Sequence, residues 1–234
     1  MSHKKGGKIA ASSLKKMIES SYKSRKEATP EIDGYKLDTA LSNKKGKVYV
    51  DANGKTIVVH RGTSGTVSDW MNNAAYLTGT YKLTDRYKTA KKLQEAAEEK
   101  YGAQNIDTVG HSQSGILARE LGKKSKNIIT VNPASLFQKK ADNETVIRSS
   151  LDPVSFLQRN PTHTIHTGSL NPLTNHSPSV LDKLPEGTML GSGLKIRKAH
   201  KQNKYHVKRG GNIISSHKSK KLAEDKMKRM MKVC

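Results

Sequence analysis

The sequence predicts an α/β fold, a mostly parallel sheet flanked by helices, with basic extensions at both ends of the chain. Two continuous apolar runs, at 106–109 and 127–131, have the character of buried strands, and a helical pattern at 116–121 lies between them. Strand, helix and strand in this order form a parallel pair joined by a right-handed crossover. With 234 residues and 33% hydrophobic residues, the chain can bury one core of modest size.

The segments before this unit predict a helix and a hairpin. Residues 8–26 place apolar side chains among lysines at loosely helical spacing. Pro30 ends that helix, because the residue before a proline avoids the helical conformation. Residues 48–60 contain two β-rich runs on either side of Asn53-Gly54. This pair readily adopts the positive φ angles of a tight turn, so the segment predicts a β-hairpin.

The remaining elements of the globular part follow from the same periodic signals. Residues 81–101 carry an apolar face at helical spacing, and Gly102 supplies the C-terminal stop. Further strands are expected at 144–148 and 162–167. No internal repeat is visible.

The net charge of +23 is concentrated at the two ends of the chain. Residues 1–30 carry eight Lys and Arg against two acidic residues, and residues 195–234 carry fourteen against two. We therefore divide the chain into a basic N-terminal helical arm at 1–30, a globular domain at 31–194 and a basic C-terminal extension at 195–234. The domain between the extensions has a nearly ordinary charge balance.

Basic extensions of this kind usually meet phosphate, either on nucleic acid or on anionic lipid. The alternative is that they are solvated and keep the protein soluble, and the sequence leaves both interpretations open. Within the C-terminal extension, we expect a small hairpin around Gly210-Gly211 and a basic helix from Leu222 to Met231.

The sequence shows no signal for membrane insertion or export. No apolar run reaches the length of about 18 residues that a membrane-spanning helix needs. The first residues lack the apolar core of a signal peptide, so we expect an intracellular, cytoplasmic protein. The single cysteine, Cys234, cannot form an internal disulfide, and neither cysteine catalysis nor a Cys-based zinc site is expected.

A chemical signature lies where the strand at 106–109 meets the following helix. From Gly110 to Gly115 the sequence reads G-H-S-Q-S-G, close to the G-x-S-x-G pattern that places a serine hydroxyl on a sharp turn above the sheet edge. Small residues two positions on either side of the serine let strand and helix approach. Ser114 stands where the pattern has its second glycine, a departure that the small size of serine tolerates. Ser112 is therefore the candidate nucleophile.

A serine nucleophile needs a base, and the base needs an acid to orient it. In α/β-hydrolases these partners follow in the chain order Ser, Asp, His, each after a later strand. Asp152 comes directly after the strand expected at 144–148, and His176 lies beyond the strand expected at 162–167. We assign Asp152 as the acid and His176 as the base.

Other carboxylates and histidines compete for these two roles. Asp142 and Asp182 are expected to be solvated surface groups, and His111 is expected to point away into the fold. His206 in the basic extension is the alternative base. Structural or solvated roles are expected for the remaining histidines, which are His60, His163, His166, His200 and His217.

Attack on an ester builds negative charge on the carbonyl oxygen, and backbone N–H groups aimed at that oxygen stabilise it. Gln113, directly after the nucleophile at the start of its helix, is expected to supply one amide. The second should come from the glycine-rich loop from His60 to Gly65, which follows the hairpin. We assign Thr63 as this donor, and the alternative is that the loop is an ordinary turn at the end of a strand.

Three blocks of the sequence resemble the class 3 (fungal-type) lipases of the α/β-hydrolase superfamily. They are 59–63 with Asp69-Trp70, the Gly-His-Ser at 110–112, and 152–154 with His176. The blocks span about residues 46–182 and leave both extensions uncovered. The resemblance implies an α/β-hydrolase fold for the domain at 31–194, esterase or lipase activity, and the roles given above to Ser112, Asp152, His176 and Thr63. It also implies that no metal and no organic cofactor is used.

The resemblance is weaker in the segment where that family carries its lid. Residues 70–86 would occupy this place, and Trp70 and Tyr76 would either cover the pocket or pack against the sheet. A weakly apolar lid does not favour strong activation at a lipid–water interface, so small esters and phospholipids stay open beside triacylglycerols. Lysine-rich arms on a compact hydrolase of this size also suggest a large DNA virus or its satellite, a virophage, as the source, and a place in the virion.

Two functions of different classes follow from these features. The first is a serine hydrolase that cleaves carboxylic esters of lipids or phospholipids through an acyl-enzyme and uses its arms to dock on anionic membrane. The alternative is a catalytically silent protein with a hydrolase-like fold that acts as a basic nucleic-acid- or membrane-binding structural component. The order of serine, acid and base favours the first, and the lysine content favours the second.

Overall fold

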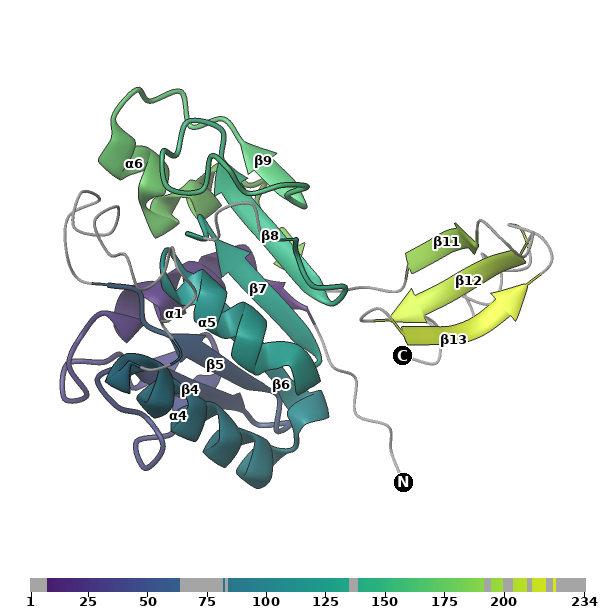
Figure 1. Ribbon diagram of the computed structural model, residues 1–234. Coiled ribbons are helices and arrows are strands. Elements are labelled where there is room, and N and C mark those ends of the chain that lie inside the picture. Colours follow the sequence, from purple (N-terminus) through teal and green to yellow (C-terminus); the bar gives the residue numbers. More distant parts are fainter. Residues whose placement is uncertain are drawn as a thin grey trace.

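The body of the protein is built on one eight-stranded sheet. The computed structural model describes residues 8–63, 82, 84–134, 139–191, 195–199, 204–209, 212–217 and 221. The strands of the sheet lie in chain order, β2 to β9 (Figure 1). They are β2 (Glu31–Ile32), β3 (Tyr35–Leu37), β4 (Gly46–Asp51), β5 (Thr56–His60), β6 (Ile106–His111), β7 (Asn127–Val131), β8 (Glu144–Ser149) and β9 (His163–Ile165). Neighbours pair antiparallel from β2 to β5 and parallel from β5 to β9.

Helices cover both faces of this sheet, as predicted for an α/β fold (Figure 1). One face carries two helices, α4 (Asp85–Tyr101) and α5 (Ser114–Leu121), and the other carries α1 (Ala11–Ser21) with the 3-10 turn η4 (Pro178–Lys183). The short elements are β1 (Ile9–Ala10), η2 (Ala103–Asn105), η3 (Gly122–Lys124), α6 (Pro172–His176) and β10 (Met189–Leu190).

Alternation along the strands explains why both faces are covered. Successive side chains of a strand point to opposite sides of a sheet. In β5, Val58 packs in the cluster under α4, whereas its neighbours Ile57 and Val59 pack in the cluster under α1. All three side chains are fully buried. A strand with consecutive apolar residues therefore requires a layer on each side.

The hairpin and the crossover predicted from the sequence are confirmed. β4 and β5 pair antiparallel, and Gly54 in the turn between them has a φ of 78°. β6 and β7 pair parallel with α5 between them in the chain. α4 ends at Gly102, whose φ is 79°, and begins at Asp85 rather than at residue 81. Thr84 caps its first turn by accepting a hydrogen bond from the Tyr87 amide at 3.3 Å.

The division of the chain at residue 30 needs a correction. Leu14, Met17 and Ile18 of α1 are fully buried in the main core cluster, and β1 just before the helix pairs with β10. Lys16 lies on the exposed side of the helix. Residues 8–30 therefore belong to the folded body and not to an arm, because the apolar stripe of the helix covers the sheet while its lysines face water.

The C-terminal extension contains a second, separate sheet of three antiparallel strands. These are β11 (Lys195–Ala199), β12 (Lys204–Arg209) and β13 (Asn212–His217). The pairing of β12 with β13 confirms the hairpin expected around Gly210-Gly211, and β11 adds a strand that the sequence did not reveal. The helix expected from Leu222 to Met231 lies outside the described residues. Among the residues that are described, no helix has both the length and the apolar character needed to cross a membrane.

A buried ion pair ties α5 to the sheet. The Arg119 Nε donates to Glu144 Oε2 at 2.7 Å, and a second guanidinium nitrogen donates to Glu144 Oε1 at 2.8 Å. The Thr130 hydroxyl, on β7, donates to the same carboxylate at 2.7 Å. Because both charges are buried and doubly hydrogen-bonded, α5 is held to β7 and β8 in one position.

Candidate active site

Ser112 lies on the turn between β6 and α5, as the sequence predicts. Its φ is 59°, a left-handed conformation that is uncommon for a residue other than glycine. The turn is held by main-chain hydrogen bonds from the Ser112 amide to the Val131 carbonyl at 3.1 Å and from the Ala134 amide to the Ser112 carbonyl at 3.0 Å. The strained residue is thus fixed at the carboxyl edge of the sheet, where only 8% of its surface is exposed.

The residues around the turn show why the departure at position 114 is tolerated. A Cβ at Gly110 would collide with the main chain of Ser114, and one at Gly115 would collide with Pro133. The close approach of helix and strand therefore needs glycine at 110 and 115. The buried Ser114 hydroxyl accepts from the His111 amide at 2.9 Å and lies 2.7 Å from the His60 carbonyl, to which it donates. Its side chain thereby links the turn to β5.

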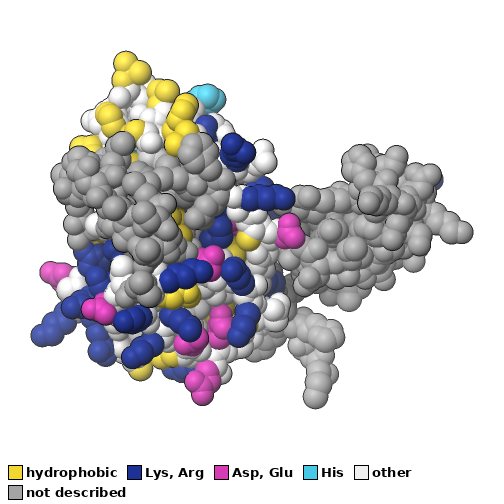
Figure 2. All heavy atoms as spheres, in the orientation of Figure 1, with side chains coloured by type: hydrophobic (Ala, Val, Ile, Leu, Met, Phe, Trp, Pro, Cys, Tyr) yellow, Lys and Arg dark blue, Asp and Glu magenta, His cyan; other side chains and the backbone are white. Residues whose placement is uncertain are grey.

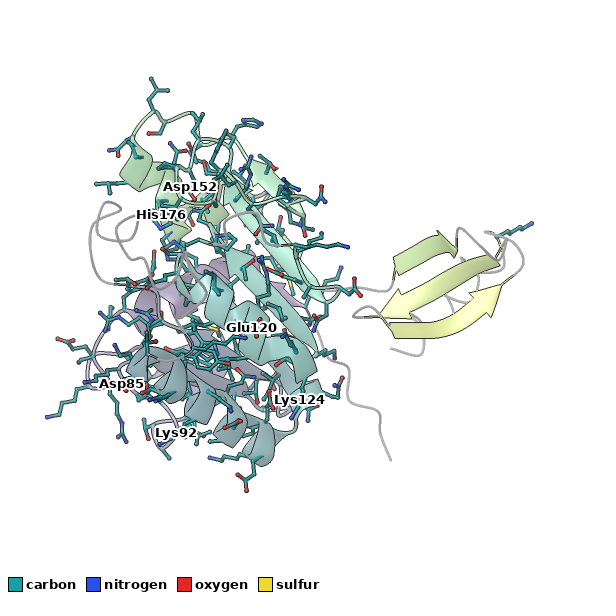
Figure 3. All side chains as sticks on the ribbon, viewed as in Figure 1. Asp85, Lys92, Glu120, Lys124, Asp152 and His176 are labelled. Atoms are coloured by element: carbon teal, nitrogen blue, oxygen red, sulfur yellow. The ribbon has the colours of Figure 1, made fainter. Side chains whose placement is uncertain are left out.

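The structure brings the three predicted catalytic residues together. The Ser112 Oγ lies 2.8 Å from Nε2 of His176, and the Nδ1 of the same ring lies 2.9 Å from Oδ1 of Asp152. Figure 3 shows Asp152 and His176 beside each other at the end of the molecule that carries α6. Asp152 is fully buried, and the His176 side chain is 15% exposed. A hydroxyl donating to Nε2 and an Nδ1–H donating to a carboxylate form the hydrogen-bonded chain of a serine triad.

The Asp152 carboxylate is held by more than the histidine. The Val154 amide donates to Oδ1 at 3.1 Å, and the Ser155 amide donates to Oδ2 at 3.0 Å. The Ser155 hydroxyl also donates to Oδ2. Every one of these donors comes from the turn that directly follows Asp152, so the loop after β8 itself aims the carboxylate at His176.

The loop that carries His176 is held by two buried asparagines. The Asn175 Oδ1 accepts from the hydroxyls of Ser149 and Thr167, each at 2.6 Å. The Nδ2 of the same side chain donates to the carbonyls of Ser169 and Asn171. Asn132 at the end of β7 donates to the Asn175 carbonyl at 2.9 Å and accepts from the Ser149 amide at 2.8 Å. The backbone of His176 is therefore fixed to the ends of β7 and β8.

His111 is not directed away from the site, which corrects the expectation from the sequence. It is buried, but its ring lies 5.2 Å from the ring of His176, and its Nε2 lies 2.8 Å from the His176 carbonyl. The Tyr22 hydroxyl lies 2.8 Å from its Nδ1. A carbonyl only accepts, so Nε2 of a neutral His111 donates to it and Nδ1 accepts from Tyr22. The hydrogen bonds from Tyr22 through His111 to His176 depend on α1 packing beside β6, which the sequence does not report.

Burial keeps two histidines of this region uncharged. Burial, and next the proximity of His176, lowers the pKa of His111 to about 3. Burial lowers the pKa of His60 to about 4, against the weaker opposing effect of its hydrogen bond to Gln94. The structural role expected for His60 is consistent with this burial. Burial also raises the pKa of Tyr22 to about 12, so its hydroxyl remains a donor.

These pKa values predict that acid destabilises the fold. The unfolded chain takes up a proton on each histidine below about pH 6.5, whereas the folded protein resists protonation until about pH 4 at His60 and about pH 3 at His111. The stabilisation is complete above the unfolded pKa and is lost as the pH falls. Between about pH 7 and about pH 5 each histidine should lower the free energy of unfolding by about 2 kcal/mol.

Urea denaturation at the two pH values measures this effect. The His60→Gln variant should lose about half of the pH dependence, since glutamine can still donate to Gln94 and does not titrate. The matched control is His166→Gln, at an exposed position, which should keep the pH dependence of the native protein. Equal pH dependence in the His60→Gln variant and the control would show that buried His60 does not contribute.

The two residues assigned to the oxyanion hole lie in contact. The Thr63 hydroxyl donates to Oε1 of Gln113 and accepts from Arg86 at 3.2 Å. Gln113 is the first residue before α5, where helix amides lack partners within the helix. A Cβ at Gly62 would collide with the Tyr22 hydroxyl, which explains a glycine in this loop. The structure thus brings the loop after β5 against the turn that carries Ser112.

The competing residues lie elsewhere or outside the described part of the chain. Asp142 is exposed, and Asp182 forms an ion pair with Lys15 at 2.8 Å, as expected of surface carboxylates. His163 lies on β9, and His166 follows it and is exposed. The side chains of residues 195–217 are not described, so His206 as the alternative base stays a prediction, and so do the roles of His200 and His217. Of the segment 70–86 expected at the lid, Trp70 and Tyr76 lie outside the described residues.

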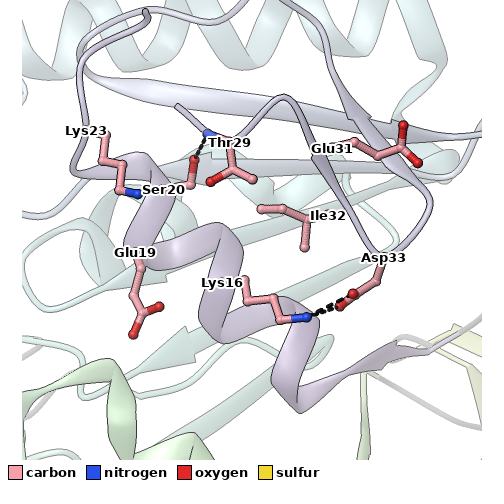
Figure 4. A pocket seen from close by; sticks show the side chains of 8 residues that line it. All are labelled: Lys16, Glu19, Ser20, Lys23, Thr29, Glu31, Ile32 and Asp33. Atoms are coloured by element: carbon pink, nitrogen blue, oxygen red, sulfur yellow. Dashed lines mark hydrogen bonds and ion pairs between the residues drawn. The ribbon is translucent and has the colours of Figure 1, made fainter. Parts of the chain in front are cut away.

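A hollow beside α1 is a separate feature of the surface (Figure 4). It is lined by side chains of α1, by Lys23 and by the segment 29–33, and none of the three triad residues takes part. Two of its five charged side chains, Lys16 and Asp33, form an ion pair at 2.9 Å. Among the described residues, no group of His, Cys, Asp and Glu side chains is arranged to hold a metal ion.

Comparison with known proteins does not indicate a function for this chain. No protein-family model matches the chain, and a search of curated proteins gives no match. What can be inferred about function rests on the serine, the histidine and the aspartate, on the distances between them, and on the elements that hold them.

Proposed function

We propose that the protein is a serine hydrolase of the α/β-hydrolase type that cleaves carboxylic esters, similar in its site to the class 3 lipases. The observation that carries this proposal is the hydrogen-bonded chain from Ser112 through His176 to Asp152, with distances of 2.8 and 2.9 Å. The residues follow in the order serine, acid, base, after β6, β8 and β9. This is the chain order of α/β-hydrolases.

The first half of the reaction forms an acyl-enzyme. The Ser112 Oγ attacks the ester carbonyl while its proton passes to Nε2 of His176, and Asp152 stabilises the resulting imidazolium. The negative charge on the carbonyl oxygen is stabilised by the amides of Gln113 and Thr63. The tetrahedral intermediate then collapses, the bond to the alcohol oxygen breaks, and His176 returns the proton to the leaving alcohol.

The second half releases the acid. Water gives a proton to Nε2 of His176 and attacks the acyl carbon, and the new tetrahedral intermediate expels the Ser112 Oγ, which regains its proton from the same ring. No metal or organic cofactor enters either step. The proton of Ser112 moves to a ring nitrogen 2.8 Å from its oxygen, which is the arrangement that general acid–base catalysis requires.

A fluorophosphonate probe tests this proposal without requiring the natural substrate. An activated serine attacks the phosphorus and expels fluoride, so the native protein should be labelled, and peptide mapping should place the label on Ser112. Protein denatured before the probe is added should not react, because the hydroxyl is nucleophilic only beside His176. No labelling of the native protein would support the silent, basic binding protein instead, and a label on another serine would remove Ser112 from the mechanism.

A further inference from the structure

Four cationic residues, Lys44, Lys45, Lys47 and Arg61, lie together at one edge of the main sheet and are called the basic cluster from here on. The three lysines stand at the start of β4, and the arginine follows the end of β5, with which β4 pairs. The Arg61 amide donates to the Lys45 carbonyl at 2.9 Å, and Nη1 of Arg61 donates to the Lys44 carbonyl at 3.3 Å. Nζ of Lys47 donates to the Asn43 carbonyl at 2.7 Å. These contacts fix the loop before β4 against the end of β5.

The basic cluster lies beside the candidate active site. The guanidinium carbon of Arg61 is 5.8 Å from the centre of the Tyr22 ring. The Tyr22 hydroxyl lies 2.8 Å from Nδ1 of His111, whose Nε2 lies 2.8 Å from the His176 carbonyl. Thr63, assigned to the oxyanion hole, follows Arg61 by two residues. A molecule whose ester carbonyl lies at the oxyanion hole can therefore place a second group at the cluster.

No carboxylate forms an ion pair with the basic cluster. None of the ion pairs found among the described residues includes one of its four members. Between residues 39 and 68 the only acidic residue of the sequence is Asp51, at the other end of β4. Other lysines of the body have such partners, as Lys15 has in Asp182. Figure 2 shows acidic side chains among the Lys and Arg side chains over the lower part of the body. The cluster thus differs from the mixed charge around it.

The members of the cluster repel one another. Burial lowers the pKa of Lys45, and the positive charge of Arg86 lowers it further. Lys44 and Arg61 act on it in the same direction. Burial, and next the charge of Arg61, lowers the pKa of Lys47, whose side chain is fully buried. Every charge that shifts the pKa of these two lysines is therefore positive. An anion bound among them would stabilise their ionised forms, because an opposite charge nearby favours the charged state.

We propose that the basic cluster binds an anionic group, a phosphate or a carboxylate, on the substrate of Ser112. The half-buried side chains of Lys45 and Arg61 contact this group, and the guanidinium has several N–H donors with which to do so. The buried Lys47 adds to the positive charge of the site. This inference rests on the proposed function and narrows it, since it names the substrate as an ester that also carries a negative charge.

Phosphate binding by the Ser112→Ala protein tests the site apart from turnover. Inorganic phosphate is titrated into isotope-labelled protein at constant ionic strength, and the backbone amide NMR signals of residues 44–47 and 61–63 should shift with one saturable dissociation constant. In this background, Lys45→Gln should weaken the binding by about fivefold, because one hydrogen-bonded charge that contacts the anion is lost. Lys45→Arg keeps the charge and should retain the binding.

Matched esters test whether the bound anion belongs to the substrate. Mono-p-nitrophenyl adipate is compared with p-nitrophenyl hexanoate, in which a methyl group takes the place of the carboxylate. Dibutyrylglycerol phosphate is compared in the same way with dibutyrylglycerol. The native protein should have the higher kcat/KM for the anionic member of at least one pair, and that pair identifies the anion as carboxylate or phosphate. Lys45→Gln should lower the ratio of the two kcat/KM values by about fivefold, and Lys45→Glu should lower it further.

Lys92→Gln is the matched control. Lys92 is exposed on α4, and Figure 3 places it away from Asp152 and His176. Its replacement also removes one positive charge, but it should leave phosphate binding and the ratio for each ester pair unchanged. Circular dichroism verifies that each variant is folded.

Two results would overturn the proposal of an anion site. One is a set of phosphate-induced shifts that leaves residues 44–47 and 61–63 unaffected. The other is the same ratio of kcat/KM values for the ester pairs in the Lys45→Gln and Lys92→Gln proteins. Failure of the chemistry is distinguishable, because the absence of labelling at Ser112 would remove the esterase function while the phosphate titration would stand.

Discussion

Replacing Ser112 with alanine is expected to lower kcat for a short p-nitrophenyl ester by at least about 10³-fold. Among the described residues, the Ser112 hydroxyl is the only side-chain group at hydrogen-bond distance from Nε2 of His176, so the variant lacks the group that would form the acyl-enzyme. Gln113 and Thr63 remain in the variant, and a small residual rate from their amides is expected. Steady-state hydrolysis measured by release of nitrophenolate gives the result directly.

Ser150→Ala is the matched control for this measurement. Ser150 is half-buried and lies two residues before Asp152, but its side chain is not part of the triad. Its replacement should leave kcat within about twofold of the native value, because a small substitution outside the triad has a small effect. Equal turnover by the Ser112→Ala variant and the native protein would contradict the triad mechanism.

Replacing Asp152 with asparagine is expected to lower kcat by about 10⁴-fold while the fold is retained. Oδ2 accepts from both the amide and the hydroxyl of Ser155, so the asparagine oxygen should take that position. Its NH₂ group then faces Nδ1 of His176, which must become an acceptor. The ring proton is forced to Nε2, and His176 can no longer accept the proton of Ser112.

The control for Asp152→Asn is Asp182→Asn. Asp182 is an exposed carboxylate paired with Lys15, and it lies six residues beyond His176 in the sequence. Loss of this exposed pair should change kcat by less than about twofold, because such pairs contribute little to stability. A decrease of less than about tenfold in the Asp152→Asn variant would show that the aspartate does not set the tautomer of His176.

The sequence was sufficient to predict those features that depend on local pattern and chain order. The turn at Asn53-Gly54 and the strands on either side of α5 follow from residue types that have few alternatives. The positions of Asp152 and His176 follow from the rule that acid and base come after later strands. In each case the signal is a short local pattern of residue types or the order of the strands along the chain, and both are visible in the sequence.

The features that were missed depend on contacts between distant residues. The charge of residues 1–30 pointed to an arm, but the apolar stripe of α1 buries Leu14 and Met17 in the core. His111 was expected to turn away from the site, yet it bonds to His176 and to Tyr22, residues 65 and 89 positions away. No periodic signal in a sequence reports which loops will meet, so these partners appear only in three dimensions.

The pairing of β1 with β10 has a consequence for the two ends of the chain, residues 1–7 and the basic C-terminal extension. Ile9 pairs with Leu190, and the Cβ position of Gly191 is 3.9 Å from the Lys8 Cα. Lys8 and Gly191, where the two ends leave the body, therefore lie side by side at the edge of the sheet where β7 begins. Ser112 lies beyond the other end of that strand, about 17 Å away for five residues of extended chain. A polyanion bound by both ends of the chain would therefore lie at the opposite edge of the sheet from Ser112.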